Sequence, residues 1–116
     1  MTDPLDRLAH ARGQSTNDWV DMRDGLIDSF PDGVAYPHNA EDVADLINYA
    51  KNYGCHIIPY GGGSSVVGHL TPLPTHRPIL SVDMTHMNKV LDINEYDRTA
   101  LIQCGASGPQ LEGELN

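Results

Sequence analysis

The sequence predicts an α+β fold, in which a small mixed or antiparallel sheet is flanked by helices. Three observations support this fold class. The segment from Asn39 to Gly54 has the spacing of an amphipathic helix, and Cys55–Tyr60 is an apolar run rich in strand-forming residues. Two alternating segments, 89–94 and 98–104, predict a hairpin. The chain has 116 residues, 40% of them hydrophobic, which suits one domain of ordinary size.

The predicted helix has recognisable ends. Asn39 is of a type that caps helix N-termini, and Asp42 follows three positions later, as in a capping box. Apolar residues recur at helical spacing at Val43, Leu46, Ile47 and Ala50. Gly54 is expected to end the helix. Pro59 then places the next strand at a sheet edge, or marks its end, because proline has no amide hydrogen to donate.

Two more strands and one more helix complete the expected elements. Gly33–Pro37 is a short strand ended by proline, and 79–84 is an apolar strand. Between them, 69–78 contains three prolines and cannot form a regular helix. A last helix is expected from Gly108, with Pro109 in its first turn.

The chain is expected to divide into two parts. Residues 1–30 are interpreted as an N-terminal lead-in segment, in which apolar residues between Trp19 and Phe30 form one stripe on a broken helix that packs on another part of the protein. Residues 31–116 are interpreted as the first part of a longer domain, because the apolar pattern of the last helix is still incomplete at Asn116.

Charge and composition disfavour several partners. The net charge is −9, with only seven Lys and Arg residues, so binding to nucleic acid or to an anionic membrane surface is not expected. There is no apolar run long enough for a transmembrane segment, and the first ten residues lack the pattern of a secretory signal. Cys55 and Cys104 are interpreted as buried free thiols in a reducing compartment, which favours an intracellular location.

The segment most informative about function is Pro59–Gly68, PYGGGSSVVG. Glycine lets the backbone approach a ligand closely, and consecutive backbone N–H groups can form an anion-binding nest. The segment lacks the lysine of a Walker A loop, and the prolines after it prevent the helix that a dinucleotide-binding fingerprint needs. A plain glycine-rich turn is the alternative at this point. The six histidines form no zinc-binding pattern, and no catalytic or metal-ligating residue is assigned.

Two longer strings resemble a known family. YPHNAEDVADLINYAKNYGCHIIPYGGGSSVVG and SVDMTHMNKVLDINEYDRTALIQCGASGPQLEGEL are similar to the FAD-binding (PCMH-type) domain of the vanillyl-alcohol-oxidase superfamily. The resemblance implies that the fold is the first lobe of a two-lobed FAD-binding domain. Within the superfamily, MRDG, PYGGGSSV and CGASGPQLEGEL are most similar to the alkyldihydroxyacetonephosphate synthase branch, which serves ether-lipid synthesis. The alternatives are the glycolate/D-lactate dehydrogenase branch and a non-enzymatic nucleotide-binding module.

The resemblance implies a role for each residue of the loop. The residues that would hold the FAD diphosphate are Pro59, Tyr60, Gly61, Gly62, Gly63, Ser64 and Ser65. Some members attach flavin through a histidine where this chain has Gly63, so FAD is expected to be non-covalent. The resemblance also implies a small-molecule or lipid-like substrate held by a cap domain beyond Asn116, a homodimer of the full-length protein, and a cytoplasmic or peroxisomal location.

Overall fold

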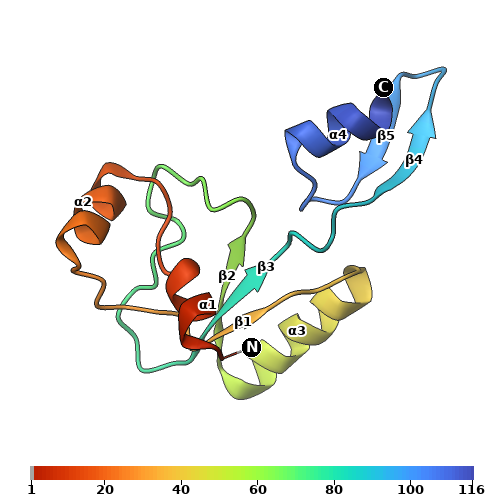
Figure 1. Ribbon diagram of the computed structural model, residues 1–116. Coiled ribbons are helices and arrows are strands. Elements are labelled where there is room, and N and C mark those ends of the chain that lie inside the picture. The colour runs from red at the N-terminus through yellow and green to blue at the C-terminus, as the bar shows by residue number, and fades with distance from the viewer. Residues whose placement is uncertain (1) are drawn as a thin grey trace.

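A computed structural model describes residues 2–116, and the α+β fold class is confirmed (Figure 1). The elements in chain order are α1 (Pro4–Ala9), α2 (Thr16–Asp24), β1 (Gly33–Ala35), α3 (Ala40–Tyr53), β2 (His56–Tyr60), β3 (Ile79–Asp83), β4 (Val90–Asn94), β5 (Thr99–Ile102) and α4 (Gly108–Leu115). The strands form two separate sheets: a parallel sheet in the order β1-β3-β2 and an antiparallel hairpin of β4 and β5. Both kinds of strand pairing are therefore present, but in different sheets.

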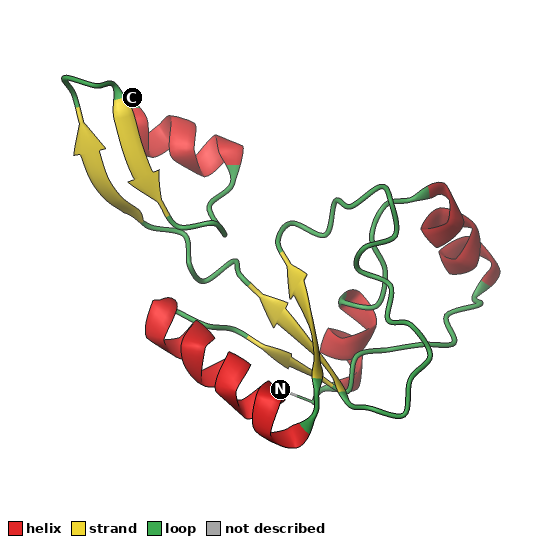
Figure 2. Cartoon of the chain, turned by 180° about the vertical axis from the view of Figure 1, so that it is seen from behind, coloured by secondary structure: helices red, strands yellow, loops and turns green. Residues whose placement is uncertain are grey.

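The parallel sheet is built around β3, which pairs with β1 on one side and β2 on the other. Strand β2 is an edge strand, as its proline predicts, and Pro59 lies opposite Val82 of the central strand. Central position explains why β3 is the most buried strand, with Ile79, Ser81, Val82 and Asp83 all buried. The figures show α1 and α3 on opposite sides of this sheet (Figures 1 and 2).

The longest helix, α3, has the predicted caps. Asn39 precedes it, and its side chain accepts a hydrogen bond from the Asp42 amide at 2.8 Å. The Asp42 carboxylate accepts from the amide of His38 rather than of Asn39, so the capping box is displaced by one residue. Gly54 ends the helix with φ 67°, a left-handed conformation that glycine adopts without strain. No helix of residues 2–116 combines the length and apolar character needed to cross a bilayer.

The lead-in segment differs from its prediction. It contains two helices, and α2 ends at Asp24, with Gly25 as its C-cap, so the predicted stripe from Trp19 to Phe30 continues beyond the helix. Local hydrogen bonds explain these positions: Asp3 caps α1, while Ser15 and Asp18 form a reciprocal capping box at α2. Trp19 and Leu26 are 59% and 63% exposed, so the predicted apolar stripe does not form a packed face.

The hairpin and α4 extend away from the parallel sheet (Figures 1 and 2). The predicted hairpin is confirmed, with a register irregularity between Val90 and Asp92. Helix α4 lies beside the hairpin, yet Leu91, Ile93 and Leu101 are more than half exposed. Cys55 and Cys104 are both free, as predicted, but neither is buried: Cys55 is half-buried, and Cys104 is exposed because it follows this hairpin.

Candidate functional site

The glycine-rich loop begins where β2 ends, at the carboxyl edge of the parallel sheet. The neighbouring strands end there at Ala35 and Asp83. No helix forms between Gly61 and Pro78, as the prolines predict. Ligands of open parallel sheets bind outside the carboxyl ends of the strands, because loops from several strands converge there. The loop therefore occupies the part of the fold where a bound cofactor is expected.

The backbone of the loop offers many unpaired donors. Within residues 2–116, no backbone N–H group from Gly61 to Val67 donates a hydrogen bond. The carbonyl group of Ser65, in contrast, accepts a hydrogen bond from the amide of Gln14 at 2.6 Å. The loop is thus held through a backbone carbonyl group, while its backbone N–H groups stay available to an anion.

The three consecutive glycines have two different roles. A Cβ atom added to Gly61 or Gly62 would meet nothing within 4 Å, so the space beside these residues is open. Gly63 has φ 71°, and a Cβ atom there would overlap the hydroxyl group of Tyr60. Gly61 and Gly62 leave room for a ligand, whereas Gly63 is required by the conformation of the protein itself.

The two serines of the loop also differ. Ser64 is exposed, and Ser65 is half-buried. The Ser65 hydroxyl group is buried without a hydrogen-bond partner among the described residues. An unpaired buried polar group costs about 1–3 kcal/mol, so this hydroxyl favours a ligand that supplies a partner. The donors, the open glycines and this hydroxyl together fit a diphosphate.

His10, from the lead-in segment, lies beside the loop. Its Nε2 atom is 2.6 Å from Oδ2 of Asp83, and its Nδ1 atom is 2.7 Å from the carbonyl oxygen of Asp6. The imidazole ring packs on the ring of Tyr60, with centroids 4.3 Å apart. Since a carboxylate and a carbonyl both accept, both hydrogen bonds form together only when each ring nitrogen carries a proton.

The electrostatics of this cluster follow from burial and hydrogen bonding. Burial alone would raise the pKa of Asp83, but hydrogen bonds from His10 and Thr85 outweigh it and hold the pKa below its ordinary value. Burial raises the pKa of Tyr60, with a further contribution from the Asp83 charge. Burial and a hydrogen bond to Asp6 raise the pKa of Tyr36. Both tyrosines therefore stay neutral at physiological pH, next to an ionised carboxylate.

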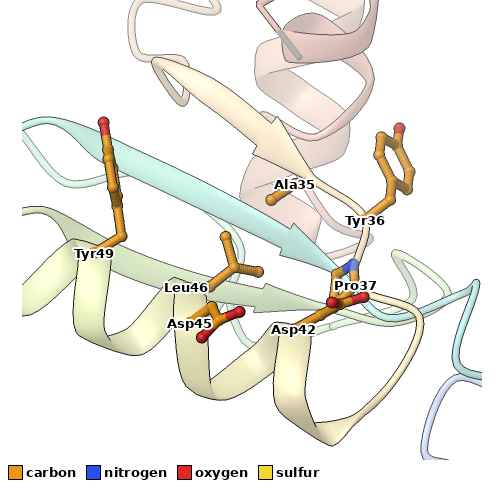
Figure 3. A pocket seen from close by; sticks show the side chains of 7 residues that line it. All are labelled: Ala35, Tyr36, Pro37, Asp42, Asp45, Leu46 and Tyr49. Carbon is orange, nitrogen blue, oxygen red and sulfur yellow. The ribbon is translucent and has the colours of Figure 1, made fainter.

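A separate hollow of about 420 Å³ lies between the end of β1 and helix α3 (Figure 3). Its lining residues are Ala35, Tyr36, Pro37, Asp42, Asp45, Leu46 and Tyr49. Two of them are carboxylates and none is a cation, so the hollow does not suit an anionic ligand. The ring of Tyr36 points away from Leu46 and Asp45. None of the seven residues that sequence reasoning assigned to a cofactor lines this hollow.

The predicted site residues are contiguous, and the structure adds others from the lead-in segment. Pro59 and Tyr60 end β2, and the other five residues form the start of the loop. Sequence reasoning missed His10 and Gln14, which lie about fifty residues earlier in the chain. No motif or spacing in the sequence identifies these two as neighbours of the loop. Among the described residues, no group of three His, Cys, Asp or Glu side chains could hold a metal ion.

Comparison with known families decides the identity of this domain. The profile of the FAD binding domain matches residues 31–116, which is most of the chain. The chain belongs to the FAD binding domain family. The predicted resemblance and the predicted cofactor, FAD, are both confirmed by this match.

Related proteins distinguish between the branches of the superfamily. The alkyldihydroxyacetonephosphate synthase of Dictyostelium discoideum is 41% identical over 114 residues, 98% of this chain and 19% of that protein. A mitochondrial D-lactate dehydrogenase (cytochrome) of Kluyveromyces lactis is 31% identical over 86 residues, 74% of this chain and 15% of that protein. The predicted similarity to the synthase branch is confirmed, with the dehydrogenase branch as a weaker match.

The fold agrees with this assignment. A solved structure of alkyldihydroxyacetonephosphate synthase superposes with a TM-score of 0.93 and 40% identity, over 99% of this chain and 21% of that chain. This chain spans about a fifth of the length of the relatives it matches. The superposed part includes the lead-in segment, although the family profile begins only at Pro31.

Proposed function

We propose that this chain holds the diphosphate of FAD in its glycine-rich loop, without a covalent bond. The residues assigned to this role are Pro59, Tyr60, Gly61, Gly62, Gly63, Ser64 and Ser65. The observation that carries the proposal is the row of backbone N–H groups from Gly61 to Val67, none of which donates within residues 2–116. Neutral amides suit a diphosphate because many weak donors can share its charge, and the loop contains no Lys or Arg.

Each part of the loop has a distinct task in this proposal. Gly61 and Gly62 let the backbone approach the phosphate oxygens, since no side chain occupies the space beside them. Ser64 and the unpaired hydroxyl of Ser65 add donors. The Tyr60 hydroxyl fills the space where a side chain at position 63 would begin, so a histidine there, which could bond covalently to flavin, does not fit this conformation.

We further propose that the full-length protein is an alkyldihydroxyacetonephosphate synthase. Residues 31–116 would be the first part of its FAD-binding domain, and residues 1–30 a lead-in segment to it. Such an enzyme exchanges the acyl group of acyl-dihydroxyacetonephosphate for a fatty alcohol without net redox change, with FAD supplying the reactive ring. The lipid-like substrate would bind to parts of the protein outside this chain. A homodimer and a cytoplasmic or peroxisomal location belong to the same proposal; the two free cysteines favour a reducing compartment.

A second candidate is a dehydrogenase of 2-hydroxy acids, in which the flavin accepts a hydride. The D-lactate dehydrogenase match favours it, although that match covers less of the chain. The full-length protein can be assayed with both substrate classes. Reduction of its flavin by D-lactate or glycolate, without incorporation of a fatty alcohol, would select the dehydrogenase.

The loop assignment is tested by Gly62→Val in the full-length protein. The valine side chain should occupy the open space beside Gly62 and prevent the approach of the diphosphate. We expect flavin content after purification to fall below about a tenth of the wild-type value, a loss of at least about 1.4 kcal/mol in binding. Gly113→Val is the matched control, because a Cβ atom there also meets nothing within 4 Å and Gly113 lies in α4, outside the loop. Normal flavin content in Gly62→Val would contradict the assignment.

A further inference from the structure

The lead-in segment runs along the glycine-rich loop and contacts both of its ends. The Tyr60 hydroxyl is 3.5 Å from the carbonyl oxygen of Ala9, and the Gln14 amide donates to the Ser65 carbonyl at 2.6 Å. Gly13 approaches so closely that an added Cβ atom would lie 2.7 Å from that same carbonyl oxygen. His10, between these contacts, is buried between Tyr60 and Asp83.

We propose that His10 is a positioning residue of the FAD site, which sets the conformation of the glycine-rich loop through a hydrogen-bonded bridge to Asp83. The inference rests on the proposed role of the loop. The bridge acts through Tyr60: His10 supports the ring of Tyr60, and the hydroxyl group of Tyr60 lies against Gly63. A shift of the His10 ring therefore moves the side chain against which the loop turns.

The side chain of His10 has polar or aromatic neighbours on every side of its ring. The groups that face its ring are Asp6 and its carbonyl oxygen, Asp83, Tyr36 and Tyr60. The nearest charged atoms are carboxylate oxygens, at 2.6 Å in Asp83 and 3.7 Å in Asp6. The ring is therefore held between two acceptors, the Asp83 carboxylate and the Asp6 carbonyl oxygen, and its orientation is fixed by both.

The lead-in segment has anchors that do not depend on His10. The side chain of Arg7 donates to the carbonyl oxygen of Pro31 at 2.7 Å. The hydroxyl group of Thr71 donates to the carboxylate of Asp18 at 3.0 Å. A substitution at His10 is therefore expected to leave the segment attached while it disturbs the loop.

The test compares His10→Gln with wild type in the full-length apoprotein, by titration with FAD. Glutamine has one amide group and cannot donate to Asp83 and the Asp6 carbonyl in the same geometry. We expect FAD to bind about tenfold more weakly, the size of one lost charge-assisted hydrogen bond. The double variant His10→Gln/Asp83→Asn should bind FAD no more weakly than either single variant, because both changes remove the same bridge.

Three further variants separate the possible outcomes. His76→Gln is the control, because His76 is an exposed histidine in the 69–78 segment, and it should bind FAD as wild type does. Asp83→Asn removes the other half of the bridge and should give the same loss of FAD affinity, which keeps the test informative if His10→Gln fails to fold. If Gly62→Val loses FAD while His10→Gln and Asp83→Asn keep wild-type affinity, the loop assignment stands and the His10 proposal is overturned. If Gly62→Val binds FAD normally, the loop assignment itself fails.

Discussion

The hydroxyl group of Tyr60 occupies the space that a side chain at Gly63 would need. The two residues lie on either side of the Gly61-Gly62 pair, so this contact closes the loop on itself. Gly63 also has a positive φ, which places its neighbours in a turn. The contact therefore separates a structural glycine from two glycines that are open to a ligand.

The first prediction concerns Gly63. Gly63→Ala should lower the free energy of unfolding by about 2 kcal/mol or more, because alanine is strained at positive φ and its Cβ atom displaces Tyr60. Thermal and urea denaturation of the full-length protein measure the effect. Gly63→Ala combined with Tyr60→Leu should recover part of the loss, since the hydroxyl group is then absent. No recovery in the double variant would show that backbone strain alone is responsible.

The second prediction concerns Gly61, where alanine is not expected to lower the stability of the protein as it does at Gly63. Gly61→Ala should leave the apoprotein unchanged or stabilise it by up to about 1 kcal/mol, because alanine restricts the unfolded chain and meets no atom in the folded one. The same variant should bind FAD more weakly, because its methyl group faces the open side of the loop. Denaturation of the apoprotein and FAD titration measure the two effects. Unchanged FAD affinity would place the diphosphate elsewhere.

The sequence predicted the local features of this fold well. The caps of α3, the edge position of the Pro59 strand and the absence of a helix after Gly68 all depend on residues close together in the chain. The pairing of β3 between β1 and β2, and the division into two sheets, depend on contacts between distant segments. The same reason explains why the candidate loop was found but its neighbours were not: His10 and Asp83 are 73 residues apart, and no periodicity links them.

The third prediction tests the N-cap of α3. Asn39→Ala should cost about 1 kcal/mol of stability, because the Asp42 amide loses its acceptor at the first turn of the helix. Ser107→Ala is the control, since Ser107 precedes α4 without a side-chain hydrogen bond to that helix. Its effect should stay within about 0.5 kcal/mol. Equal losses in the two variants would indicate that the Asn39 hydrogen bond adds no stability.

The fourth prediction is a loss of stability in acid that depends on Asp18. Burial would raise the pKa of Asp18, but hydrogen bonds from the amide and hydroxyl groups of Ser15 and from Thr71, together with the charge of Arg12, outweigh it and lower the pKa below its ordinary value. A lowered folded-state pKa contributes stability above the unfolded-state pKa of about 3.9, and this contribution disappears as the pH falls through the folded value.

Asp18→Asn should therefore be less stable than wild type near pH 6, with the difference shrinking as the pH falls below about 4. Denaturation midpoints measured across this range provide the check. Asp45→Asn, an exposed carboxylate on α3, is the control and should follow wild type at each pH. A gap between Asp18→Asn and wild type that stays constant down to about pH 2 would contradict the assigned pKa direction.

The last prediction concerns the connection between the two sheets. An added Cβ atom at Gly105 would overlap the Met84 carbonyl group and lie 2.9 Å from the Met87 carbonyl oxygen, which also accepts a hydrogen bond from the Gly105 amide at 2.9 Å. These atoms are backbone and cannot move aside as a flexible side chain could. Gly105→Val should therefore separate the end of the hairpin from the turn after β3 and cost at least about 2 kcal/mol. Gly113→Val, with open space around its Cβ atom, should melt as wild type does. If Gly105→Val also melts as wild type does, the close packing of these two segments does not stabilise the protein.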